Sequence, residues 1–186
     1  KRVDESGAHL ALDFVRLVET LLEAWAVEPP AQLRGGGLAI RDFTAATQLL
    51  KTSEHVTALV IEVAHSAGLL NADLEDGWLP TVAYDRWSSI DDAARWALLA
   101  QTWRNMSRAP HVVGGEGSDR INPLTASVER GFITPLRSAL LDIYSSLPTG
   151  AVTSAALVTE YLDWHRPRRA SNVRAKIQLN GLARCG

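Results

Sequence analysis

The sequence predicts a mainly α fold, helical with small β-hairpins, and three observations support this prediction. Apolar residues recur every three or four positions along most of the chain, which is the spacing of amphipathic helices. Prolines and glycines separate these stretches at short intervals. Residues 30–84 show the pattern of a short extended entry, two helices and a turn-rich ribbon, which is the element order of a winged helix. We therefore expect tandem winged-helix-like units.

Length and composition set the class of protein. The 186 residues, of which 46% are hydrophobic and 22% charged, suit a globular chain with one sizeable core or two small ones. The single cysteine, Cys185, excludes an internal disulfide framework and a cysteine-rich metal site, which favours a reducing cytoplasm. No apolar run reaches the roughly 18 residues of a membrane span, so no membrane partner is expected. Because the first residue is Lys1, we expect a piece of a larger chain.

Residues 1–30 predict an N-terminal packing helix. Its apolar residues recur with helical spacing from about Ala8 to Trp25, and Ser6 is the candidate N-cap. Glu28-Pro29-Pro30 is expected to end the helix, because proline lacks an amide donor and disfavours helical angles in the residue before it.

Residues 31–110 predict the first winged-helix-like unit and a following helix. Gly35-Gly36-Gly37 indicates a tight turn; the alternative, a phosphate cradle, lacks the Gly-Lys-Ser or Gly-Lys-Thr of a Walker sequence. Helices are expected over Arg41–Leu50 and, behind a Thr52 or Ser53 cap, over Glu54–Ala67. Gly68 takes the expected position just after the second helix.

The second of these helices would be the recognition helix of a helix-turn-helix, yet its charge does not suit DNA. Without arginine or lysine, its outward face would repel phosphate. His55 and His65 do not share a helix face, so we expect solvated or capping histidines and no metal site. The residues expected to face outward include Glu54, Thr57, Glu62 and Ser66.

A hairpin is expected next, because turn-forming residues 71–77 separate Leu69-Leu70 from Trp78-Leu79. Its acidic residues lack the spacing of a calcium loop, so we expect a solvated wing tip, which is also a poor contact for DNA.

The following helix is expected to begin at Ser88 or Ser89 and to bury one face. Six tryptophans in one chain also suggest a stacking platform for bases or sugars, but tryptophans spaced seven apart on one helix are typical of a core. The expected buried face carries Ala93, Trp96, Ala100, Trp103 and Met106.

The second half of the chain predicts another helical unit. Residues 111–133 are expected to form a loop, and residues 134–186 a second helix-turn-helix or winged-helix-like unit, complete or truncated. The helix starts are expected at Thr134-Pro135, at Thr153 or Ser154 before Ala155–His165, and at Ser171 before Asn172–Asn180.

Positive charge collects at the end of this unit. The formal net charge of -2 does not supply the basic surplus typical of nucleic-acid-binding proteins. No acidic residue follows Asp163, however, and the basic residues there form either a solvated surface or a stripe that binds DNA phosphates. The candidate nucleic-acid-binding residues are Arg166, Arg168, Arg169, Arg174 and Lys176.

Several short motifs support a family resemblance through their order and spacing. They are Pro29-Pro30, Leu33 to Asp42, Gly68-Leu69-Leu70, Trp78-Leu79-Pro80-Thr81, Tyr84-Asp85-Arg86-Trp87, Arg95-Trp96 and Arg108-Ala109-Pro110. From about Leu10 to Arg169 the chain resembles the actinobacterial helicase-associated proteins whose C-terminal region is similar to the XPB helicase N-terminal domain. The resemblance implies an internal, winged-helix-rich segment linked to DNA repair or transcription, with DNA, a helicase or other domains of a parent chain as partners. It implies no catalytic residues.

Two functions from different classes remain. The first is a non-catalytic winged-helix segment of a helicase-associated protein that contributes to DNA binding. The alternative is a protein–protein interaction scaffold without direct nucleic-acid contact, which the acidic helix and wing tip favour. No enzyme and no cofactor are expected, because the chain has no Walker A sequence or Asp-Glu-x-His box, and its Ser, His and Asp residues form no nucleophile elbow or metal motif.

Overall fold

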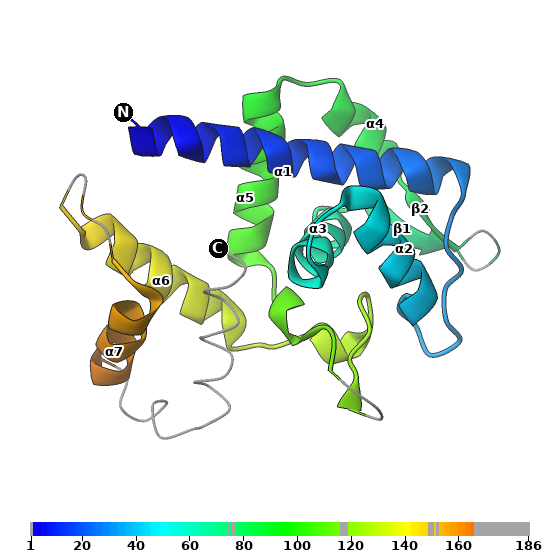
Figure 1. The fold of residues 1–186 in the computed structure, drawn as a ribbon. Coiled ribbons are helices and arrows are strands. Elements are labelled where there is room, and N and C mark those ends of the chain that lie inside the picture. Colours follow the sequence, from blue (N-terminus) through cyan, green and yellow to red (C-terminus); the bar gives the residue numbers. More distant parts are fainter. Residues whose placement is uncertain are drawn as a thin grey trace.

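The computed structural model describes residues 2–73, 75, 77–115, 119–148, 151 and 153–165, and these are mainly helical with one small hairpin (Figure 1). The predicted mainly α class with a small β-hairpin is confirmed, whereas the tandem winged-helix-like arrangement stays a prediction. The first elements are α1 (Arg2–Val27), α2 (Ile40–Leu50), α3 (Glu54–Ser66), β1 (Leu70–Asp73) and β2 (Gly77–Pro80). They are followed by α4 (Val82–Ser88), α5 (Asp92–Asn105), the 3-10 helices η1 (Pro110–Val112) and η3 (Ala126–Val128), α6 (Ile133–Ser146) and α7 (Ala155–His165).

Helix α1 spans the molecule and crosses α5 in Figure 1. Asp4 and Glu5 in its first turn complement the positive end of the helix dipole, so the helix begins before Ser6 and the predicted Ser6 cap is wrong. Its end at Val27 confirms that the two following prolines stop it. The stripe that it buries consists of Val15, Val18, Leu21, Leu22 and Trp25.

A glycine turn leads from α1 into α2. Gly36 and Gly37 have φ angles of 80° and 89°, which glycine adopts without strain. The turn is closed by the Leu33 N–H, which donates to the Gly37 carbonyl at 3.1 Å. The predicted tight turn is therefore confirmed, and α2 and α3 follow it with the predicted Ser53 cap, whose Oγ accepts from the Val56 N–H at 3.3 Å.

The hairpin is joined to the start of this turn. Strands β1 and β2 are antiparallel, with Leu70 opposite Pro80. The Trp78 N–H donates to the Pro30 carbonyl at 2.9 Å, and its indole N–H donates to the Gly37 carbonyl at 3.1 Å. These two bonds attach the segment between α1 and α2 to β2.

Residues 82–105 form two helices where one was predicted. Thr81 caps α4 and Asp91 caps α5, each by accepting a backbone N–H with its side chain. The predicted start at Ser88 or Ser89 is wrong because Ser88 is the last residue of α4. The predicted buried face is correct at its end, where Met106 is buried and Trp103 packs against the larger core, but it is wrong at Trp96, which is 39% exposed, and it misses Leu99, which is 1% exposed.

Two clusters of buried apolar residues are present. The larger one joins α1, α2, α3, the hairpin and α5. The smaller one joins α6 and α7, which lie on the opposite side of the molecule from α2 and the hairpin (Figure 1). Between them, Ala109 belongs to the smaller cluster, Val113 to the larger one, and Val112 packs against both.

The second half departs from prediction at one helix start. Helix α6 begins at Ile133, so Thr134 is not its N-cap and instead donates its hydroxyl to the Met106 carbonyl at 3.1 Å. The predicted Ser154 cap of α7 is confirmed, because its Oγ accepts from the Leu157 N–H at 3.3 Å. Residues 111–133, expected as a loop, contain η3 and the last two residues of η1, and the predicted helix Asn172–Asn180 lies outside the described residues. None of the helices that the structure describes is both long and apolar enough to span a bilayer.

Candidate functional site

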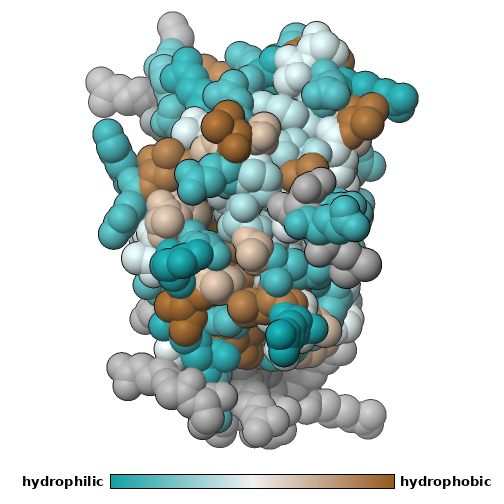
Figure 2. Space-filling model, turned by 90° about the vertical axis from the view of Figure 1, so that its right-hand side faces the viewer, coloured by the Kyte–Doolittle hydropathy of each residue, from teal (hydrophilic) through white to brown (hydrophobic). Residues whose placement is uncertain are grey.

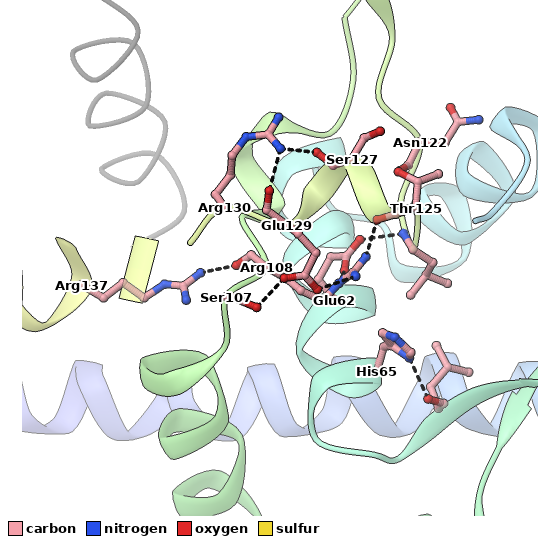
Figure 3. A network of polar contacts seen from close by, with 12 residues as sticks. Glu62, His65, Ser107, Arg108, Asn122, Thr125, Ser127, Glu129, Arg130 and Arg137 are labelled. Atoms are coloured by element: carbon pink, nitrogen blue, oxygen red, sulfur yellow. Dashed lines mark hydrogen bonds and ion pairs between the residues drawn. The ribbon is translucent and has the colours of Figure 1, made fainter. Parts of the chain in front are cut away.

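A buried polar network is centred on Glu62 of α3 (Figure 3). The Glu62 side chain is 0% exposed, and its carboxylate accepts hydrogen bonds from the Arg108 Nε and from the Leu124 N–H, the latter at 2.7 Å. A buried carboxylate without such partners would be costly, because it loses the hydration of its charge. Glu62 therefore fastens two later segments of the chain onto α3.

Arg108 extends the network to the segment before α6. Its Nη1 donates to Glu129 at 3.1 Å and its Nη2 to the Thr125 carbonyl at 2.9 Å. Burial lowers the pKa of Arg108, but the hydrogen bond and negative charge of Glu62, together with Glu129, outweigh burial and raise the pKa above its ordinary value. The guanidinium therefore remains charged.

Arg137 attaches α6 to the same region. It is fully buried, and its guanidinium donates to the backbone carbonyls of Met106 and Arg108, the latter at 2.6 Å. The guanidinium carbon also lies 5.2 Å from the centre of the Trp103 ring, a cation–π contact. Helix α6 is thus held to the residues that leave α5.

Helix α3 is enclosed by the rest of the fold. It contacts α1, α2, α5, β1 and η1, and Figure 1 shows it in the interior beneath α1. The expectation that Thr57 and Glu62 face solvent is wrong, because both are 0% exposed. Glu62 is buried because it pairs with a residue 46 positions away, which helical periodicity alone does not reveal. The buried residues of α3 are Thr57, Ala58, Val60, Ile61, Glu62, Val63 and Ala64.

The two histidines of α3 serve the fold in different ways. His65, expected to be solvated or capping, is half-buried: its ring lies edge-on to Trp78 with 5.5 Å between centroids, and its Nδ1 lies 3.1 Å from the Leu70 carbonyl oxygen. His55 is half-buried in the first turn of the helix. In the described part of the chain no group of three or more His, Cys, Asp or Glu residues is placed to hold a metal ion.

His111 of η1 is an isolated polar group between the two clusters. Both of its ring nitrogens are buried without a hydrogen-bond partner. Burial, followed by the positive charges of Arg137 and Arg130 and by His55, lowers the pKa of His111 to about 4. The sequence offered no signal for this residue, since a lone histidine between Pro110 and Val112 belongs to no motif.

The basic residues predicted to bind nucleic acid, Arg166, Arg168, Arg169, Arg174 and Lys176, all lie outside the described residues, so this stripe stays a prediction. Among the described arginines that pair with carboxylates, two are largely shielded from solvent: Arg95 lies 3.2 Å from Glu19, and Arg108 is paired with Glu62. These pairs neutralise charge that DNA phosphates would otherwise attract.

A groove and an apolar patch on the surface of the described residues are candidate binding features. The groove, with a volume of about 350 Å³, lies between α5 and the end of α3, and all of its lining residues are uncharged: Ser66, Leu98, Gln101, Thr102, Asn105 and Met106. We call the other feature the α1–α5 patch; it consists of Leu10, Phe14 and Trp96. On the different face that Figure 2 presents, hydrophobic side chains occur in small groups separated by hydrophilic ones.

The α1–α5 patch is continuous across two helices. Phe14 and Trp96 pack edge to face with 6.1 Å between ring centroids, and Leu10 lies one turn before Phe14 on the same face of α1. Leu10 is 69% exposed and Trp96 is 39% exposed, so apolar area on both helices remains in contact with water.

Comparison with protein-family models, curated proteins and solved structures gives no match. The resemblance to helicase-associated proteins therefore stays a prediction from short sequence motifs.

Proposed function

We propose that the chain is a non-catalytic protein–protein interaction scaffold built on a winged-helix-like first unit that makes no direct contact with nucleic acid. The observation that supports this function best is the enclosure of α3. A recognition helix must present one face to the base edges of the major groove. Here the central residues of α3 are buried, and Glu62 is engaged by Arg108 and Leu124.

The order of elements supports the winged-helix-like interpretation. Helices α1, α2 and α3 precede the hairpin, and the Pro30 carbonyl accepts a hydrogen bond from the Trp78 N–H of β2. In this interpretation the hairpin is the wing. Its tip carries Asp73 and Glu75, whose negative charge disfavours a phosphate backbone and leaves the wing open to a protein contact.

The proposed partner is the apolar surface of another protein domain, either in a larger parent chain or in a helicase, in the cytoplasm. The α1–α5 patch is the surface we assign to it, because an exposed tryptophan beside an exposed leucine is the kind of anchor that protein interfaces bury. The uncharged groove beside α5 holds no acid–base pair, which agrees with a binding role.

Site-specific photo-cross-linking in the parent cell tests this proposal. A photoreactive phenylalanine at Leu10 or Trp96 should give a discrete cross-linked product, joined either to a second polypeptide or to a domain of the parent chain outside residues 1–186. The matched control carries the same residue at Glu160, which is exposed on α7. Absence of a product from both patch positions, or the same product from the control, would contradict the proposal.

DNA binding through the end of the chain is the second candidate function. The supporting observation is the run of basic residues after Asp163, with no acidic residue among them. Fluorescence anisotropy with a labelled duplex at low salt should then show binding that weakens steeply as salt is added, and the double reversal Arg168→Glu, Arg169→Glu should remove it. Reversal of Arg104, an exposed residue at the end of α5, is the control and should leave the affinity unchanged.

A further inference from the structure

We propose that His111 is an acid-sensitive latch: while its imidazole is neutral, η1 stays packed between α3 and α6, and protonation separates the α6–α7 pair from the larger core. This inference concerns the connection between the two cores and does not depend on the proposed scaffold function.

The first observation is the place of His111 in the fold. It lies in η1, which packs against α3, and its neighbours Ala109 and Val113 belong to different cores. Its two ring nitrogens are buried and without a hydrogen-bond partner. An imidazole in this position satisfies neither its N–H nor its lone pair, so a proton gained there would find no acceptor.

The second observation is the charge around the ring. Arg137 acts on it from α6, Arg130 from the residues before α6, and His55 from the first turn of α3. The buried carboxylate of α3, Glu62, is engaged by Arg108 and Leu124. Because the cations lower the pKa of His111 further than burial does alone, protonation adds a positive charge where positive charge already collects.

Arg137 cannot easily turn away from that charge. Its guanidinium is anchored to the carbonyls of Met106 and Arg108 and lies over the Trp103 ring. Repulsion is therefore relieved by movement of the backbone that carries these groups. The contact that can open is the one between residues 107–109, just before η1, and residues 128–130, just before α6, which is closed by the Ala109 N–H to Val128 carbonyl and Arg130 N–H to Ser107 carbonyl hydrogen bonds.

The size of the effect follows from the two protonation equilibria. In the open state His111 regains an ordinary pKa of 6.5, and in the closed state its pKa is about 4. The opening equilibrium then rises about 20-fold between pH 7 and pH 5, since protons bind the open state preferentially.

Amide hydrogen exchange followed by NMR tests the latch in the full chain, after correction for the intrinsic pH dependence of exchange. Protection of the Ala109 and Arg130 amides should fall about 20-fold from pH 7 to pH 5. At pH 5 it should be lower than that of the Trp78 amide, which is bonded inside the larger core. His111→Gln should abolish the fall, whereas His9→Gln, which changes an exposed histidine of α1, should leave it intact.

Three results would overturn the latch. The Ala109 and Arg130 amides could be as strongly protected as the Trp78 amide at pH 5, which would mean that the contact between the two cores opens only when the whole chain unfolds. The His111→Gln chain could keep the acid response. If that variant does not fold, the wild-type imidazole signal of His111 decides: titration near 6.5 in the folded protein contradicts the latch, and titration near 4 supports it.

Discussion

Glu62 and Arg108, 46 residues apart in the sequence, form a buried ion pair that joins α3 to the segment between α5 and α6. The remaining oxygen of Glu62 holds the Leu124 N–H, and Leu124 has the left-handed φ of 64° that leucine seldom adopts. The pair thus stabilises a backbone conformation that the leucine itself disfavours. It also covers the helix that a DNA-binding winged helix would expose.

Removing one member of this pair should be strongly destabilising. Arg108→Met leaves the Glu62 carboxylate buried without its cation, and we expect the free energy of unfolding to fall by about 3–5 kcal/mol. Urea unfolding at pH 7 measures this change. Arg16→Ala is the control, because its pair with Asp13 is exposed and should contribute less than about 1 kcal/mol. Equal effects of the two substitutions would contradict the assigned role of Glu62.

The glycine turn should tolerate alanine at one position and not at another. A Cβ at Gly37 would lie 2.4 Å from Thr125 Cγ2 and 2.9 Å from the Pro123 carbonyl oxygen, and the φ of 89° adds strain. We expect Gly37→Ala to lower the thermal midpoint by an amount equivalent to about 1–3 kcal/mol. Gly35→Ala, where nothing lies within 4 Å, should change the midpoint little. Calorimetry on both variants distinguishes a packed turn from a merely flexible one.

The buried face of α5 gives a second packing test. Leu99 is 1% exposed, so Leu99→Ala should cost about 2–5 kcal/mol through lost burial and the cavity left behind. Leu98→Ala, one residue away on the exposed side, should cost less than about 1 kcal/mol. Denaturant unfolding measures both losses of free energy through the shift in midpoint, provided that the slopes of the unfolding curves are equal. A larger loss at Leu98 would mean that α5 is rotated from the position described.

Stability should depend on pH through His111. Its pKa is about 4 in the folded state and 6.5 in the unfolded state, so between these values the unfolded chain binds more protons. The contribution of neutral His111 is therefore complete above about pH 6.5 and is lost as the pH falls toward 4. We expect the free energy of unfolding to be about 2 kcal/mol smaller at pH 5 than at pH 7 from this group. Urea titrations should show that His111→Gln removes this component; an unchanged pH dependence would assign it to other groups.

Local sequence was sufficient for some helix ends and for the hairpin. Ser53 and Ser154 act as caps, the prolines after Val27 end α1, and the turn residues before Gly77 place the two strands. These features depend on interactions within a few residues, so neighbouring residues in the sequence are enough to predict them. At the start of α5 both Ser89 and Asp91 are residue types that can act as an N-cap, and in the structure the Asp91 carboxylate is the N-cap.

The sequence by itself determined a mainly helical chain with a small hairpin and the position of its glycine turn. Tertiary structure alone decided that α3 is enclosed, that Leu99 rather than Trp96 is the buried residue of α5, and that Glu62, Arg108 and Arg137 meet in one network. The physical reason is the range of the interactions. Periodicity places a glutamate on the polar side of an isolated helix, whereas burial of that glutamate depends on an arginine that only folding brings within hydrogen-bonding distance.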